Sequence, residues 1–141
     1  MASLLLLLTL GCSIHDWQHR VHSKKMSRAG VTEHTVALGT STVHYWRGEQ
    51  EAGPPVLLLH GFGGDALFTW SAQLPLAERH LLIAPDLLWF GESHADAPRS
   101  IRTQVETFLA LLDHAELVFF DICIHLDLDL EPLEFDAVSF F

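Results

Sequence analysis

The sequence predicts an α/β fold, in which an N-terminal β-hairpin is followed by the first part of a mostly parallel sheet with flanking helices. Two short segments, residues 56–59 and 81–84, are apolar at every position, which is typical of strands buried on both faces of a parallel sheet. One helical pattern lies between these segments and another follows them. Strands that alternate with helices favour right-handed crossovers in a single sheet. We expect this sheet to be incomplete.

The first 30 residues precede the predicted domain. Residues 1–12 begin with an apolar run that leads into Gly11-Cys12. This pattern is similar to a bacterial lipoprotein signal, which implies export and a membrane anchor on a lipidated Cys12. The alternative is a plain apolar N-terminus on a cytoplasmic protein. Residues 13–30 are polar and are predicted to be a solvated linker, although their bases also allow a basic patch that touches anionic lipid. Those bases are Arg20, Lys24, Lys25 and Arg28.

The next elements are predicted from local patterns. Segments 31–38 and 42–48 are rich in β-branched residues and flank Gly39-Thr40-Ser41, which predicts an antiparallel hairpin. Between the two buried strands, apolar residues recur at helical spacing over residues 67–79. Pro75 is expected to break or restart this helix, because proline lacks the backbone N–H that a helix interior uses.

A second helix is predicted to begin after Ser100, whose hydroxyl suits the N-cap position. The apolar residues that follow have offsets of one helix face. They are Ile101, Val105, Phe108, Leu109 and Leu112. We therefore expect this face to pack against the sheet.

The amino-acid composition and net charge exclude several classes of function. The chain has 141 residues, 49% of them hydrophobic, which suits one small globular domain. Its net charge of −10 argues against nucleic-acid binding, which needs a cationic face. The two cysteines do not make a disulfide framework. No cofactor motif is present in the sequence, and we expect no cofactor and no metal.

Two motifs follow the two buried strands directly. The first is His60-Gly61-Phe62-Gly63-Gly64-Asp65, and the second runs from Pro85 to Ser93. Taken together, they resemble the α/β-hydrolase fold family, in its branch of lipases, esterases and C–C-bond hydrolases. The resemblance covers residues 31–117, which correspond to the N-terminal portion of such a domain.

The resemblance implies roles for several residues. The backbone N–H of Phe62 is implied to be one donor of an oxyanion hole, with His60 and Gly61 shaping the loop around it. Backbone donors of this kind stabilise the negative charge that acyl transfer builds on oxygen. The candidate substrate-binding residues are Phe62, Leu67, Trp70, Leu88 and Trp89. Trp89 stands where the family usually has glycine, so a positive φ there would strain it by about 1–2 kcal/mol.

The nucleophile of the family is missing from the sequence. No G-x-S-x-G segment occurs, and no base or acid partner is assigned. Two alternatives are Ser93, whose segment has Gly91 but Ala95 in place of the last glycine, and Cys123 after an apolar run, whose segment lacks both glycines. The alternating acids and His125 beyond it also allow a metal site, but a solvated strand face is the better interpretation. These residues are His125, Asp127, Asp129 and Glu131.

The end of the chain differs in character from the rest. Residues 103–141 hold nine acids and no Lys or Arg. We interpret residues 118–141 as a divergent acidic tail and hypothesise that a frameshift or interruption joined it to the front of a hydrolase. The expected ancestral function is hydrolysis of a small-molecule ester or related carbonyl substrate by a Ser–His–acid mechanism, with this chain inactive as written. The alternative is a non-enzymatic degenerate hydrolase that binds a small apolar ligand or partner.

Overall fold

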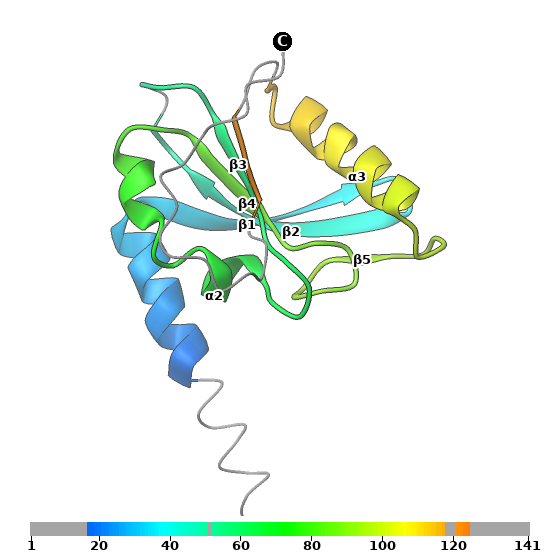
Figure 1. The fold of residues 1–141 in the computed structure, drawn as a ribbon, viewed down its shortest axis with the longest axis horizontal. Helices are drawn as coiled ribbons and strands as arrows, with labels where there is room; N and C mark the ends of the chain where they lie inside the picture. Colours follow the sequence, from blue (N-terminus) through cyan, green and yellow to red (C-terminus); the bar gives the residue numbers. More distant parts are fainter. Residues whose placement is uncertain (1–16, 51, 118–120, 125–141) are drawn as a thin grey trace, which may run out of the picture.

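The computed structural model describes residues 17–50, 52–117 and 121–124. Its strands form one mixed sheet in the order β1-β2-β4-β3-β6, with β5 paired to β2 beside this row (Figure 1). The strands are β1 (Val31–Leu38), β2 (Ser41–Gly48), β3 (Val56–Leu59), β4 (Leu82–Pro85), β5 (His94–Ala95) and β6 (Asp121–Ile124). The predictions for residues 1–12, including Cys12, and for most of the acidic tail, including His125, lie outside the described residues.

The strand directions confirm the predicted α/β class. β1 and β2 form the expected antiparallel hairpin, in which Leu38 pairs with Ser41. Gly39 turns the chain with a φ of 62°, in the region that glycine adopts without strain. β3 pairs in parallel with both β4 and β6. The hairpin therefore joins the parallel part of the sheet through the antiparallel β2–β4 pair.

Helices cover both faces of the sheet. In Figure 1, α3 (Ile101–His114) lies over one face, and α2 (Ala66–Thr69) lies with an N-terminal helix over the other. Two separate apolar clusters result, because neighbouring residues of a strand point to opposite faces. Leu57 belongs to the cluster under α3, whereas Leu58 belongs to the cluster under α2. This explains why β3 is apolar at every position.

The helix expected over residues 67–79 is divided into two short pieces. α2 ends at Thr69, and a 3-10 helix, η1 (Leu74–Glu78), begins with Pro75 in its first turn. The restart at Pro75 is therefore confirmed, because proline is tolerated where the first N–H groups have no helical partner.

Residues 17–28 form a helix, which differs from the solvated linker expected over residues 13–30. Met26 is 1% exposed and belongs to the cluster under α2. Sequence periodicity missed this helix because only a narrow stripe of it is buried, while the rest is polar. No helix among the described residues is both long and apolar enough to cross a membrane.

The face that α3 buries also differs from the prediction. Ser100 is the N-cap, as expected, and its hydroxyl accepts from the Thr103 N–H at 3.1 Å. However, only part of the predicted apolar face is covered. Phe108 and Leu112 are buried, together with Thr107 and Leu111. Three predicted core residues are exposed: Ile101 by 83%, Val105 by 51% and Leu109 by 60%.

Candidate active-site loop

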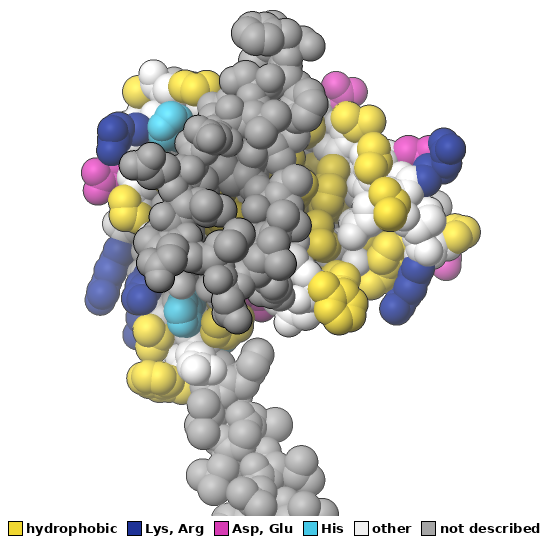
Figure 2. All heavy atoms as spheres, in the orientation of Figure 1, with side chains coloured by type: hydrophobic (Ala, Val, Ile, Leu, Met, Phe, Trp, Pro, Cys, Tyr) yellow, Lys and Arg dark blue, Asp and Glu magenta, His cyan; other side chains and the backbone are white. Residues whose placement is uncertain are grey.

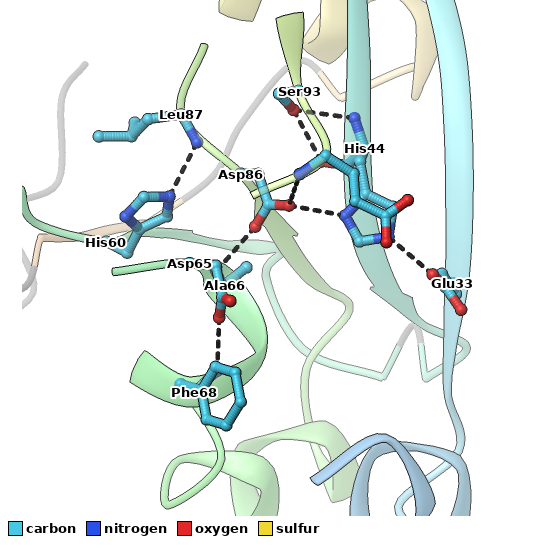
Figure 3. Close-up of polar contacts among 10 residues, drawn as sticks. Glu33, His44, His60, Asp65, Ala66, Phe68, Asp86, Leu87 and Ser93 are labelled. Carbon is cyan, nitrogen blue, oxygen red and sulfur yellow. Dashed lines mark hydrogen bonds and ion pairs between the residues drawn. The ribbon is translucent and has the colours of Figure 1, made fainter. Parts of the chain in front are cut away.

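The loop after β3 lies at the carboxyl edge of the parallel strands. β3 and β4 are parallel neighbours, so the residues that follow them meet at the same edge. His60 follows β3 and is 2% exposed. Its Nε2 accepts a hydrogen bond from the Leu87 N–H, which follows β4, at 2.9 Å (Figure 3). This bond connects the two predicted motifs.

The same imidazole holds the backbone of the loop. Because Nε2 accepts from a backbone N–H, the ring carries its proton on Nδ1. Nδ1 therefore donates to the Gly61 carbonyl oxygen, at 2.8 Å. That carbonyl and the Phe62 N–H belong to one peptide unit, and planar trans peptides point these groups in opposite directions. His60 thus orients the Phe62 N–H.

The side chain of Phe62 is exposed to solvent. The residue is 87% exposed. Its ring packs edge-to-face on the Phe90 ring, with 5.5 Å between the two ring centroids. Phe90 makes the same kind of contact with His60. Within the described part of the chain, no acceptor takes a hydrogen bond from the Phe62 N–H.

A second polar cluster lies beside this edge and was missed by sequence reasoning. The His44 Nδ1 is 2.8 Å from the Asp86 Oδ2, and the His44 Nε2 is 3.0 Å from the Glu33 Oε1 (Figure 3). The Asp86 carboxylate also accepts from the N–H groups of Ala66 and Glu92. The position of Asp86 directly after a buried strand was the one sequence signal for this cluster.

Charge pairing favours the ionised form of both members of the His44–Asp86 pair. Burial by itself would lower the pKa of His44, but the hydrogen bond and charge of Asp86, with help from Glu33, raise the pKa above its ordinary 6.5. Burial would likewise raise the pKa of Asp86, but the bonds from His44 and from two backbone N–H groups lower the pKa below 3.8. The pair therefore holds β2 to the loop after β4.

Glycine is needed where the loop passes this pair. A Cβ on Gly91 would lie 2.1 Å from the Asp86 Oδ2, and the residue has a φ of 51°. Only a residue without a side chain lets the backbone approach the carboxylate so closely. The glycine in the second motif thus has a packing reason.

Neither alternative nucleophile sits in a nucleophile's geometry. Ser93 is 3% exposed, and its Oγ bonds to the backbone N–H and carbonyl of His44 rather than to the imidazole. Cys123 lies within β6, in register with Leu58, whereas a nucleophile elbow places its residue on the turn after a strand.

One group of side chains among the described residues has the spacing of metal ligands. Glu33, His44 and Glu92 offer atoms that lie within 4.8 Å of one another. Both ring nitrogens of His44 already face carboxylates, so a metal at Nε2 would have to displace the bond from Glu33. The ion pairs therefore account for how His44 and Glu33 are placed.

The predicted substrate-binding residues are dispersed. A hollow of about 350 Å³ is lined by Leu67 and Trp46, but also by the acids Asp65, Asp86 and Glu92. Phe62, Trp70, Leu88 and Trp89 do not line it. Trp70 and Leu88 are 3% and 0% exposed within the two apolar clusters.

Trp89 packs against the cluster under α3. It has a φ of 69°, which confirms the strained position anticipated from the missing glycine. Its indole Nε1 donates to the Ala95 carbonyl at 3.4 Å, and the Arg99 guanidinium lies 5.7 Å from the ring centroid. These contacts hold the residue in its strained conformation.

Comparison with known proteins finds hydrolases that are similar to this chain. No family model matches the chain. An 89-residue stretch is 37% identical to an epoxide hydrolase of Caballeronia sordidicola, covering 60% of this chain and 26% of that protein. Lipase 1 of Psychrobacter immobilis is 36% identical over 87 residues, with the same two shares. The chain spans about a quarter of the length of these curated relatives.

A solved structure covers more of the chain. The crystal structure of a membrane phospholipase A superposes with a TM-score of 0.67 and 27% identity, over 87% of this chain and 42% of that one. The likeness to this structure and to the two hydrolases defines the class of protein: the described residues have the α/β-hydrolase fold. The fold is incomplete, since the chain covers 42% of that structure.

Proposed function

We propose that this chain is the front part of a hydrolase for small-molecule esters or related carbonyl substrates. The observation that carries the proposal is the clamp made by His60, which bonds to the Gly61 carbonyl and the Leu87 N–H. An oxyanion hole needs donors that are fixed before the charge develops. A buried imidazole that holds the adjoining carbonyl supplies that rigidity to the Phe62 N–H. The lipase and phospholipase relatives support an ester as substrate.

In the proposed mechanism, a serine attacks the substrate carbonyl, with a histidine as base and an acid behind it. The Phe62 N–H donates to the carbonyl oxygen as it becomes an oxyanion. His60 remains a positioning residue, because its two nitrogens are occupied by backbone groups. The serine, the base and the acid are not assigned to any residue of this sequence.

We also propose that the 141-residue chain by itself has no hydrolase turnover. It contains no G-x-S-x-G segment, and Ser93 bonds to backbone groups. The purified chain should leave a short-chain nitrophenyl ester intact beyond the buffer rate. Robust cleavage that is abolished by Ser93→Ala or Cys123→Ala would overturn this proposal.

The encoding DNA tests the hydrolase proposal itself. Reading it from the codon of Leu117 onward in all three frames should reveal G-x-S-x-G, followed by an acid and a histidine. In a chain restored to that frame, His60→Ala should lower kcat by about 10²–10³, the usual loss for one oxyanion donor, with little effect on KM. A normal kcat in His60→Ala would contradict the role of the loop.

A frame search that finds no nucleophile would favour the alternative, a non-enzymatic protein that binds a small ligand or partner. The hollow beside His44 has a volume in the range of ligand sites, but its three acids suit an apolar ligand poorly. Cooperative unfolding with saturable binding and no turnover would support this alternative.

For localisation, we propose export and attachment through a lipidated Cys12, with a cytoplasmic protein as the alternative. The support is the Gly11-Cys12 sequence and the likeness to a membrane phospholipase. Metabolic labelling with a radioactive fatty acid should mark the wild-type chain and not Cys12→Ala. Equal labelling of both chains, or of neither, would reject this form of attachment.

A further inference from the structure

The helix over residues 17–28 concentrates positive charge in an acidic protein. It holds four of the eight Lys and Arg residues and no Asp or Glu. The whole chain has a net charge of −10, so the remainder carries −14. An anionic surface would repel most of this molecule and attract this helix.

The four bases lie on the outward side of the helix. Arg20, Lys24 and Arg28 recur every four residues, which places them along one stripe, and Lys25 flanks it. All four are exposed. In Figure 2, Lys and Arg side chains gather at the lower left, where Figure 1 draws this helix.

The opposite side of the helix fixes this orientation. Met26 is buried in the cluster under α2, and the His22 ring lies 5.1 Å from that of Phe68. The helix therefore cannot turn its basic stripe inward without losing these contacts. Among the ion pairs of the described residues, none involves Lys24, Lys25 or Arg28.

An exposed tryptophan begins the same stripe. Trp17 stands three residues before Arg20 and seven before Lys24, the spacing of one helix face, and is 63% exposed. An indole is apolar with one polar N–H, and such rings settle at the level of lipid headgroups. A tryptophan beside cations is therefore suited to a charged bilayer surface.

We propose that the helix over residues 17–28 is a membrane-surface contact, in which the basic stripe binds anionic lipid headgroups and Trp17 enters the interface. The helix is positively charged and the rest of the chain is negatively charged, which favours an anionic bilayer as the partner. Only an extended anionic surface can contact the whole basic stripe at once. This contact is independent of the hydrolase proposal and of a lipid on Cys12.

Flotation of the full chain with vesicles tests the contact. The chain should float with mixed phosphatidylcholine–phosphatidylglycerol vesicles more than with phosphatidylcholine alone, and added salt should weaken this binding. Each base near an anionic surface contributes about fivefold in affinity, so Lys24→Gln, Lys25→Gln and Arg28→Gln together should reduce it about a hundredfold. The matched control removes three exposed bases elsewhere: Arg79→Gln, Arg99→Gln and Arg102→Gln.

Tryptophan fluorescence provides a second readout. Trp46 and Trp70 are already 2% and 3% exposed, and the remaining tryptophan, Trp89, is half-buried. A blue shift on anionic vesicles should therefore come mainly from the exposed Trp17 and be lost in Trp17→Phe. Equal flotation with both vesicle types would overturn the proposal and assign binding to the apolar run before the helix. Equal losses in the two triple variants, or no flotation at all, would overturn it as well. Neither readout depends on turnover.

Discussion

At the scale of single residues, the His44–Asp86 pair is the main polar feature of the described fold. It connects β2 to the loop after β4, and Glu33 on β1 occupies the other ring nitrogen of His44. Both ring nitrogens face carboxylates, which favours the charged form of the imidazole. Breaking a buried pair by removing one partner leaves an uncompensated charge, at a cost of about 3–5 kcal/mol.

The stability that this pair contributes should depend on pH. The pKa of His44 is raised above 6.5, so its contribution is complete below pH 6.5 and is lost as the pH rises through the folded-state pKa. The pKa of Asp86 is lowered below 3.8, so its contribution is present above pH 3.8 and is lost as the pH falls through that lower value. The window of full stabilisation therefore lies between these two limits.

Urea denaturation of His44→Gln checks this expectation. The free energy of unfolding should fall by about 3 kcal/mol relative to wild type at a pH between 3.8 and 6.5, and the difference should shrink as the pH rises above neutrality. His94→Gln is the matched control, since it removes an exposed imidazole and should change stability by less than about 0.5 kcal/mol. A difference that grows with pH would contradict the ion pair.

Trp89 provides a separate test of backbone strain. Its φ is 69°, where a Cβ costs about 1–2 kcal/mol. Trp89→Gly and Trp89→Ala lose the same indole contacts, but only the alanine keeps the strain. We expect the glycine variant to be the more stable of the two by about 1 kcal/mol, measured by chemical denaturation. If alanine proves equal or better, the positive φ is wrong.

At the scale of elements, α3 is turned relative to its sequence pattern. The prediction placed Leu109 in the core and did not include Leu111. In the structure, Leu109 is 60% exposed, whereas Leu111 is fully buried. A buried hydrogen bond of 3.0 Å between the Thr107 and Ser41 hydroxyls accompanies this orientation. Because apolar residues extend over more of α3 than the sheet can cover, the pattern alone could not say which of them are buried.

Two leucine substitutions on α3 distinguish the two orientations. Leu111→Ala should lower the free energy of unfolding by about 3 kcal/mol, since it leaves a cavity in the core. Leu109→Ala should lower it by less than about 0.5 kcal/mol. Thermal or urea unfolding of both variants measures the contrast, and the reverse order would restore the face predicted from periodicity.

At the scale of the whole molecule, the helix over residues 17–28 is part of the packed body. It covers one face of the sheet together with α2 and contributes Met26 to the apolar cluster there. Met26 is 1% exposed, while its neighbour Lys25 is exposed. The folded unit therefore begins before the predicted boundary at Val31.

A pair of substitutions in this helix measures its contribution. Met26→Ala should destabilise the protein by about 2–4 kcal/mol, the usual range for a buried side chain of this size. Lys25→Ala should change the free energy of unfolding by less than about 0.5 kcal/mol. Equal small effects would mean that the helix is a solvated appendage after all.

The sequence by itself determined the α/β class, the hairpin, the two central strands, the N-cap at Ser100 and the two loop motifs. These features depend on neighbouring residues: a strand buried on both faces must be apolar throughout, and a turn must hold glycine or a capping hydroxyl. Tertiary structure alone decided the His44–Asp86 pair, the buried face of α3 and the docking of residues 17–28. Each of these depends on contacts between segments far apart in the chain, which local patterns do not record.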